Sequence, residues 1–275
     1  MFYEGSEKRL EITTTSNLLE VNNNFWQAMV KEAGAYIISK IENVHVKAFL
    51  LSESSLFVWK NRLLLITCGE TQLVKASLYF QKNVARKEIT SLLFQRHQSH
   101  YPDRQKSSFQ QDRLLLQKQL KGDSHHWNKD YCGDIFLFGN NQQPNATTNI
   151  LMLHGLSGDF FEQLQKGKVP AQHVASHLQL IKHFNGFIID QFSFDPKGYS
   201  LNAINGEYYF TVHITPETLS SYISFESNLL AENTDSFKHH LVTLFKPLRS
   251  DLMQFTQHKK HLSIETTSIA HKQKK

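Results

Sequence analysis

The chain has 275 residues, of which 40% are hydrophobic and 20% charged, an ordinary balance for a globular protein with a sizeable core. Its formal net charge of +5 is not gathered in one block, so we attribute it to solubility and anion attraction rather than to nucleic-acid binding. Cys68 and Cys132 are too few for a disulfide framework, and no apolar run approaches the roughly 18 residues of a membrane span. Because the stretch "MFYEGSEKRLEI" lacks a signal-peptide core, we expect a cytoplasmic protein.

Hydrophobic periodicity predicts alternating strands and helices along the chain. In chain order, we expect strands at 44–51, 61–69, 88–95, 132–139, 149–155, 186–194, 207–215 and 221–227, and helices at 70–86, 107–120, 170–184 and 236–245. Ser107 or Ser108 is the expected N-cap of the second helix. Strands outnumber helices and are often joined by short links. This favours an α/β (α+β) fold with largely antiparallel sheets whose outer faces are covered by helices.

The stretch "AFLLSESSLFV", residues 48–58, interrupts an apolar run with three hydroxyls and a carboxylate. Polar groups in such a place cost desolvation free energy unless they are paired or used. Four further patches are rich in chemically active residues: "FYEGSEKRLE", "TCGET", "FDPKGYSLN" and "YFTVHITPE…SYISFESN". Each alone has a structural interpretation. Cys68 suits a small buried position, "DPKGYS" has the composition of a turn, and His213 alternates with Tyr209 and Thr211 on one strand face.

Together and in this order, the five patches resemble the motifs of eukaryotic-type S-adenosylmethionine decarboxylase, a pyruvoyl-dependent proenzyme. The resemblance runs from residue 2 to about 228 and is thin between 95 and 185. It implies a single domain over residues 1–275 that cleaves itself into residues 1–53 and 54–275. The implied fold is a four-layer αββα sandwich, with two facing antiparallel sheets, helices outside and an internal duplication.

The implied reaction is decarboxylation of S-adenosylmethionine to S-adenosylmethioninamine, the aminopropyl donor for spermidine and spermine synthesis. It runs through a Schiff base to a pyruvoyl group that the chain makes from Ser54 by cleaving the Glu53–Ser54 bond. By resemblance, Ser200 stabilises the cyclic intermediate of cleavage and His213 removes the α-proton of Ser54. Cys68 then reprotonates the product carbanion. The resemblance also assigns two further residues to catalysis, Glu4 and Glu7.

The resemblance assigns substrate binding to the residues that flank these motifs. Tyr3 and Phe194 are expected to sandwich the adenine, Glu217 to accept hydrogen bonds from the ribose, and Leu51 to contact the substrate. Asp195 and Lys197 stand where the family commonly has Asn and Cys, without displacing Phe194 or Ser200. No metal, nucleic-acid or membrane partner is predicted, and the two-chain protomer is expected as a monomer or homodimer.

Animal members of the family are stimulated by putrescine, which is held by buried acidic residues. The matching stretch here is "PNATTNILM", which has Asn145 and Asn149 in place of both carboxylates. Arg9 stands where plant enzymes, which need no putrescine, have Arg. We therefore expect a charge site, formed by Arg9 and Arg96 with Glu226, to replace the dication.

Two other functions remain as alternatives. An α/β-hydrolase-like esterase would use Ser200, because "NILMLHGLSG" resembles an oxyanion loop and "GYSLN" is one residue short of the G-x-S-x-G elbow. Against it, Asn202 replaces the last Gly and His213 follows only 13 residues after Ser200. The second alternative is a catalytically dead regulatory paralogue, but this chain keeps the active residues of the family motifs.

Overall fold

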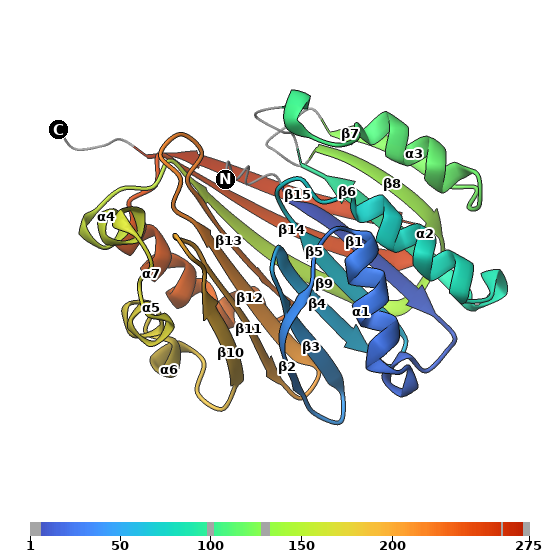
Figure 1. The fold of residues 1–275 in the computed structure, drawn as a ribbon, viewed down its shortest axis with the longest axis horizontal. Coiled ribbons are helices and arrows are strands. Elements are labelled where there is room, and N and C mark those ends of the chain that lie inside the picture. Colours follow the sequence, from blue (N-terminus) through green and yellow to red (C-terminus); the bar gives the residue numbers. More distant parts are fainter. Residues whose placement is uncertain (1–6, 98–101, 128–132, 260, 272–275) are drawn as a thin grey trace. The chain divides into compact units, whose positions relative to one another are not determined.

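The computed structural model describes residues 7–97, 102–127, 133–259 and 261–271. Over this part of the chain the strands form an eight-stranded and a seven-stranded sheet (Figure 1). The chain divides into two compact units. Unit 1 comprises Met1–Pro144 with His258–His261, and unit 2 comprises Asn145–Gln257 with Leu262–Lys275.

The sheet of unit 1 has the strand order β2-β3-β4-β5-β1-β6-β8-β7, and every neighbouring pair is antiparallel. Its strands are β1 (Lys8–Thr14), β2 (Ile37–Glu42), β3 (Val46–Leu51), β4 (Ser54–Trp59), β5 (Arg62–Thr67), β6 (Ile89–Arg96), β7 (Asp123–Trp127) and β8 (Gly133–Gly139). Consecutive strands β2 to β5 form a meander that needs only short turns. The sheet therefore brings the end of β5 beside the start of β4.

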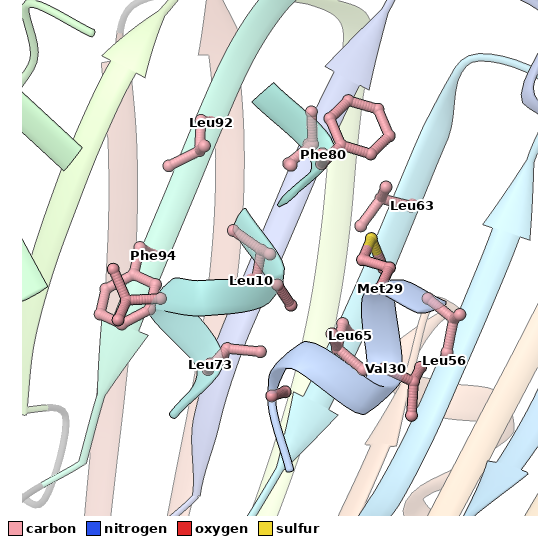
Figure 2. Close-up of a cluster of buried hydrophobic side chains, with 14 of the residues drawn as sticks. Leu10, Met29, Val30, Leu56, Leu63, Leu65, Leu73, Phe80, Leu92 and Phe94 are labelled. Atoms are coloured by element: carbon pink, nitrogen blue, oxygen red, sulfur yellow. The ribbon is translucent and has the colours of Figure 1, made fainter. Parts of the chain in front are cut away.

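Three helices cover one face of this sheet: α1 (Asn23–Glu32), α2 (Leu73–Asn83) and α3 (Phe109–Gln117) (Figure 1). The apolar side of each helix packs against every second residue of the strands, because side chains alternate between the two faces of a strand and recur on one side of a helix every three to four residues. Figure 2 shows Leu10, Leu63 and Leu65 of the strands among Met29 and Phe80 of the helices. This cluster is the hydrophobic core of unit 1, and it holds the strands in register.

The opposite face of β1 is buried as well, although it is charged. Leu10 and Ile12 belong to the core, whereas Arg9 and Glu11 alternate with them and remain 3% and 6% exposed. Buried charges are stable only when they are paired. Glu11 meets this condition through ion pairs with Arg9 at 2.7 Å and with Arg62 at 2.9 Å.

The sheet of unit 2 has the order β10-β11-β12-β13-β9-β14-β15, and the pairs from β10 to β9 are antiparallel. Its strands are β9 (Asn141–His154), β10 (Ile188–Ser193), β11 (Tyr199–Asn205), β12 (Tyr208–Thr215), β13 (Tyr222–Ser227), β14 (Arg249–Lys259) and β15 (His261–Ala270). The helices that pack on it are α4 (Asp159–Lys166), α5 (Ala171–His177), α6 (Leu180–His183) and α7 (Asp235–Phe245). Phe184, Phe210, Phe225 and Phe237 join these helices to the sheet as one aromatic cluster. The polar residues of β11 and β12 alternate with this core and face away from it.

The structure confirms the predicted class, with two antiparallel sheets and covering helices, and differs in several elements. The helix expected at 170–184 is broken into α5 and α6 because Gln179 adopts a left-handed conformation with φ of 52°. The expected turn "DPKGYS" ends earlier, since β11 already begins at Tyr199. The interrupted run at 48–58 is a hairpin of β3 and β4 rather than one strand. Ser108 is confirmed as an N-cap, within a capping box that includes Gln111.

Short 3₁₀ turns complete the described elements: η1 (Leu18–Glu20), η2 (Arg86–Glu88), η3 (Pro102–Arg104) and η4 (Ala231–Asn233). Among the helices of the described ranges, none combines the length and apolar character needed to cross a membrane. The same ranges contain no cluster of three His, Cys, Asp or Glu side chains arranged for a metal ion.

Candidate active site

The hairpin between β3 and β4 places Ser54 at the first position of β4. Leu51 pairs with Ser54, which leaves Ser52 and Glu53 as the two-residue turn. Ser54 has a φ of 133°, a region that residues other than glycine rarely adopt. Such strain costs about 1–3 kcal/mol and is found chiefly at functional sites. Ser52 anchors the turn, because its Oγ accepts a hydrogen bond from the backbone N–H of Tyr36 at 3.1 Å.

Cys68 holds the carbonyl oxygen of Glu53 with two hydrogen bonds. Its backbone N–H donates at 3.1 Å and its Sγ–H donates at 3.2 Å. The contact follows from the sheet register. Ser54 pairs with Thr67, so Glu53, which precedes Ser54, lies beside Cys68, which follows Thr67. Two donors on one carbonyl oxygen polarise the carbonyl and can stabilise negative charge that develops there. This arrangement is the electrophilic group of the candidate site in unit 1.

The turn that carries Cys68 is itself fixed by polar contacts. Lys8 Nζ donates to the carbonyl oxygen of Gly69 at 2.6 Å, and Thr71 Oγ1 lies 2.9 Å from the carbonyl oxygen of Cys68. Gly69 has a φ of 64°, which favours glycine at this position. Glu7, which precedes β1, is buried, and its carbonyl oxygen accepts the N–H of His97. The start of β1 thus supports the loop that positions the thiol.

The carboxyl group of Glu53 has a perturbed acidity. Burial raises the pKa of this group from 4.5 to about 7, with Glu70 adding to the increase while Lys8 and Lys106 oppose it. A carboxyl that titrates near neutral pH is common at functional sites. The residue on the acyl side of the expected cleavage point is therefore partly neutral at working pH.

Ser200 and His213 form a second candidate site, which lies in unit 2. They are directly opposite each other on β11 and β12, and Ser200 Oγ lies 2.8 Å from His213 Nδ1. The other ring nitrogen, His213 Nε2, lies 2.8 Å from Thr211 Oγ1. Burial lowers the pKa of His213 from 6.5 to about 3, so the imidazole is neutral near neutral pH. A neutral histidine next to a hydroxyl can act as a general base.

The expected substrate-binding residues are placed in different surroundings. Phe194 is half-buried and packs edge-on against Phe192 with ring centroids 5.0 Å apart. Glu217 makes an ion pair of 3.4 Å with Lys197, the residue that departs from the family pattern. Leu51 is fully buried in the helix-side core of unit 1.

The arginines of the expected charge site do not lie together. Arg9 is opposite Gln95 on β6, whereas Arg96 is opposite Lys8, so the two guanidinium groups leave opposite faces of the sheet. Arg96 instead pairs with Asp112 of α3 at 2.7 Å. Arg62, which the sequence analysis did not single out, forms an ion pair with Glu11, as Arg9 does.

Burial raises the pKa of Glu11, but Arg62 and Arg9 outweigh this effect and hold that pKa below its usual value.

Glu226, in unit 2, accepts a hydrogen bond from the Tyr209 hydroxyl at 2.7 Å. Tyr3 and Glu4 lie outside the described residues, as does the side chain of Asn145. Asn149 donates from Nδ2 to the carbonyl oxygen of Leu229.

Sequence reasoning missed three residues that organise these sites: Lys8, Arg62 and Thr211. Lys8 and Arg62 are charged residues next to apolar strands, which by composition suggests solvent exposure, and only their partners reveal burial. The alternation of Thr211 and His213 did place both side chains on one face. The hydrogen bond between them could not be deduced from that alternation.

A strained serine follows a polarised carbonyl in unit 1, and a serine is hydrogen-bonded to a buried neutral histidine in unit 2. The first of these arrangements is suited to attack of the serine hydroxyl on the preceding carbonyl, the reaction by which self-processing proteins make a catalytic group from their own chain. The family model of adenosylmethionine decarboxylase matches residues 1–275. The chain belongs to the adenosylmethionine decarboxylase family.

Individual relatives agree with the family match. The chain is 30% identical to the S-adenosylmethionine decarboxylase proenzyme of Dictyostelium discoideum, over 90% of this chain and 73% of that one. It is 31% identical to the proenzyme of Drosophila melanogaster, over 90% and 80% of the two chains. Its fold is similar to the crystal structure of the Trypanosoma brucei AdoMetDC-delta26 monomer, with a TM-score of 0.58, 23% identity and coverage of 73% and 79%. These matches confirm the predicted family and enzyme class, and they favour neither alternative function.

The pyruvoyl group of this family fits the residues present. It requires a serine whose preceding carbonyl can be attacked, and Ser54 follows the carbonyl that Cys68 polarises. The strained backbone of Ser54 is a second observation at the same bond. The predicted cofactor, a covalent group made from the chain itself, is thereby supported by both the family and the local geometry.

The raised pKa of Glu53 predicts a pH-dependent stability. Because the folded chain holds this proton more tightly than the unfolded chain, the stabilisation is full below the unfolded pKa of 4.5 and is lost as pH rises through about 7. We expect the melting temperature of uncut Ser54→Ala protein to fall, over this window, relative to the same protein carrying Glu53→Gln. Glu32→Gln, at an exposed position of α1, is the control and should follow the parent. Parallel curves for the parent and Glu53→Gln would contradict the shift.

Proposed function

We propose that this chain is a proenzyme that cleaves its own Glu53–Ser54 bond and then decarboxylates S-adenosylmethionine for polyamine synthesis. The observation that carries the proposal is the pair of hydrogen bonds from Cys68 to the carbonyl oxygen of Glu53. We further propose that units 1 and 2 belong to one catalytic domain. The product is a cytoplasmic two-chain protomer of residues 1–53 and 54–275, as a monomer or homodimer.

Cleavage begins with attack of the Ser54 hydroxyl on the carbonyl carbon of Glu53. The reacting groups are adjacent in the chain, so proximity supplies much of the rate. As the carbonyl carbon becomes tetrahedral, negative charge grows on its oxygen, where the N–H and S–H of Cys68 already donate. We assign Ser200 as a further donor to this intermediate. Rupture of the Glu53–Ser54 C–N bond then leaves Glu53 esterified to Ser54.

The ester is removed by elimination. His213 takes the α-proton of Ser54. The electron pair of that C–H bond forms the Cα=Cβ double bond as the Cβ–O bond breaks, and the α-carboxylate of Glu53 leaves as the new C-terminus. The dehydroalanine left at residue 54 takes up water and loses ammonia, which gives the pyruvoyl group. Because His213 is buried and neutral, its unprotonated ring nitrogen can accept a proton without first losing one.

When formed, the pyruvoyl group supplies the electron sink for decarboxylation. The side chains of this protein bind the substrate and move protons. Cys68 donates a proton to the α-carbon of the product, since a thiol with a pKa of roughly 8.5 is protonated at neutral pH. Phe194 and Tyr3 stack on the adenine, and Glu217 accepts hydrogen bonds from the ribose. Further assignments are Glu4 and Glu7 to catalysis and Leu51 to substrate contact.

Self-cleavage is the first prediction of this proposal. The denatured wild-type protein should show two masses, for residues 1–53 and for residues 54–275 with an N-terminal pyruvoyl group. Ser54→Ala should give a single uncut mass, because the attacking hydroxyl is missing. Ser52→Ala is the matched control in the same turn and should still cleave. An intact wild-type chain that nevertheless releases carbon dioxide would exclude this mechanism.

Substitution of Cys68 separates the two roles that we assign to it. Cys68→Ala keeps the backbone N–H, so cleavage should slow by no more than about tenfold, the scale of one lost hydrogen bond. Turnover by the cleaved protein should be largely lost because the proton donor is gone. Cys68→Ser restores a donor to Glu53 but is a far weaker acid, so it should rescue cleavage and not turnover. Full steady-state activity in Cys68→Ala would reduce this residue to a structural role.

We also propose that arginine charge replaces a polyamine activator. Arg9 and Arg62 share one carboxylate, Glu11, so two guanidinium groups and one carboxylate are buried together. A charge pair 4 Å apart is worth about 4 kcal/mol at an effective dielectric near 20, so such a charge can hold an acidic partner. We assign Glu226 to the same charge site, whereas Arg96 lies on the helix-covered face of the sheet and pairs there with Asp112.

This assignment predicts that putrescine does not activate the processed wild-type enzyme. Carbon dioxide release should be unchanged across a putrescine titration. Arg9→Leu removes one buried positive charge while Glu11 keeps Arg62, so this variant should lose activity and regain part of it with putrescine. Arg96→Leu removes a guanidinium group from the opposite face and should not gain a putrescine response. A several-fold, saturable activation of the wild type would refute the assignment.

A further inference from the structure

We propose that Thr211 is a positioning residue that fixes the tautomer of His213, so that Nδ1, beside Ser200, is the basic nitrogen. This inference deepens the proposed function and rests on the role of His213 in self-cleavage. It is carried by a chain of three hydrogen bonds on β11 and β12 of unit 2. The chain runs from Ser200 through His213 and Thr211 to the backbone of Leu201.

The direction of this chain is set at its backbone end. Thr211 Oγ1 lies 2.8 Å from the carbonyl oxygen of Leu201, and a carbonyl oxygen can only accept. The single hydroxyl proton of Thr211 is therefore committed to Leu201. Towards His213, the Thr211 oxygen has only lone pairs to offer. His213 Nε2, at 2.8 Å from that oxygen, must carry a proton and donate it.

A neutral imidazole carries one proton, so Nε2–H leaves Nδ1 as an acceptor. Before cleavage Ser200 Oγ, at 2.8 Å, donates to that nitrogen, and the hydroxyl turns from it to donate to the cleavage intermediate, which leaves Nδ1 to take the α-proton. The hydrogen-bond network thus assigns the lone pair of His213 to the side of Ser200. All three side chains are buried, at 5% exposure or less, so water does not readily offer an alternative set of partners.

The strand register explains why this arrangement is rigid. Thr211 and His213 are two residues apart on β12 and share a face, while Ser200 lies directly opposite His213 on β11. Thr211 is β-branched, which restricts its side-chain rotation within the strand. With the tautomer reversed, Nδ1 would carry the proton and could not accept the α-proton of Ser54. The elimination step would then lack its base.

The test compares Thr211→Val, which lacks the hydroxyl, with Thr211→Ser, which keeps it. Thr215→Val is the matched control, since Thr215 is buried on the same face of β12. Cleavage is timed on freshly translated chains by gel and mass. Thr211→Val should complete cleavage about tenfold more slowly, whereas Thr211→Ser and Thr215→Val should stay within about twofold of wild type.

The step affected identifies the cause. If the base is misplaced, the Thr211→Val chain should accumulate the ester, which hydroxylamine splits into a Glu53 hydroxamate and a chain beginning with Ser54. Nitrogen-15 NMR of His213 in the uncut Ser54→Ala protein should show a protonated Nε2 and an unprotonated Nδ1. The added Thr211→Val substitution should produce a mixture of tautomers.

The outcomes separate this inference from the proposed function. An unprotonated Nε2 in the Ser54→Ala protein, or Thr211→Val cleaving at the wild-type rate, would overturn the role of Thr211. Equal slowing by Thr211→Val and Thr211→Ser would also overturn it, because the hydroxyl would then not be the cause. Normal cleavage by His213→Ala would instead refute the proposed function, whatever the tautomer.

Discussion

The unit 1 site depends on the two hydrogen bonds that Cys68 donates to the carbonyl oxygen of Glu53. These hydrogen bonds can form in only one strand register. Leu51 must pair with Ser54, and Ser54 with Thr67, for the two-residue turn to reach the residue after β5. A slip of one residue would turn every side chain of the strand to the other face. Leu56 and Leu65, buried against α1 and α2, make such a slip costly. The hydrophobic core therefore sets the geometry of a polar reaction centre.

The sequence was informative where chemistry and periodicity are local. Short apolar segments located β3, β5, β6 and β12, and the motif order identified the family. Strands whose polar residues are buried were harder to find. β1 contains Lys8, Arg9 and Glu11, and all are buried. Arg9 pairs with Glu11 on the same strand, but Glu11 also pairs with Arg62 of β5, and Lys8 donates to the carbonyl oxygen of Gly69. The contacts with Arg62 and Gly69 cannot be read from the seven residues of β1.

The site was predictable as a list of residues and not as a set of contacts. The motifs supplied Ser54, Cys68, Ser200 and His213, but the resemblance could not show that Arg96 pairs with Asp112 on the face away from Arg9. The broken helix at Gln179 has the same origin. Its helical spacing continues across α5 and α6, and only packing of each segment on the sheet accounts for the change of direction. Tertiary contacts outweigh local propensity at such points.

Burial of His213 fixes its protonation state, but it also makes the imidazole a weaker base. The lowered pKa keeps the imidazole neutral near neutral pH, and in our proposal the hydrogen bond to Thr211 fixes which nitrogen carries the proton. A base whose pKa lies far below the ambient pH removes a carbon-bound proton more slowly than a matched base. In a multiple-turnover enzyme this would limit the rate. In the self-cleavage that we propose, His213 acts once in the life of each chain, so a slow base in one fixed orientation suffices and deep burial is tolerated.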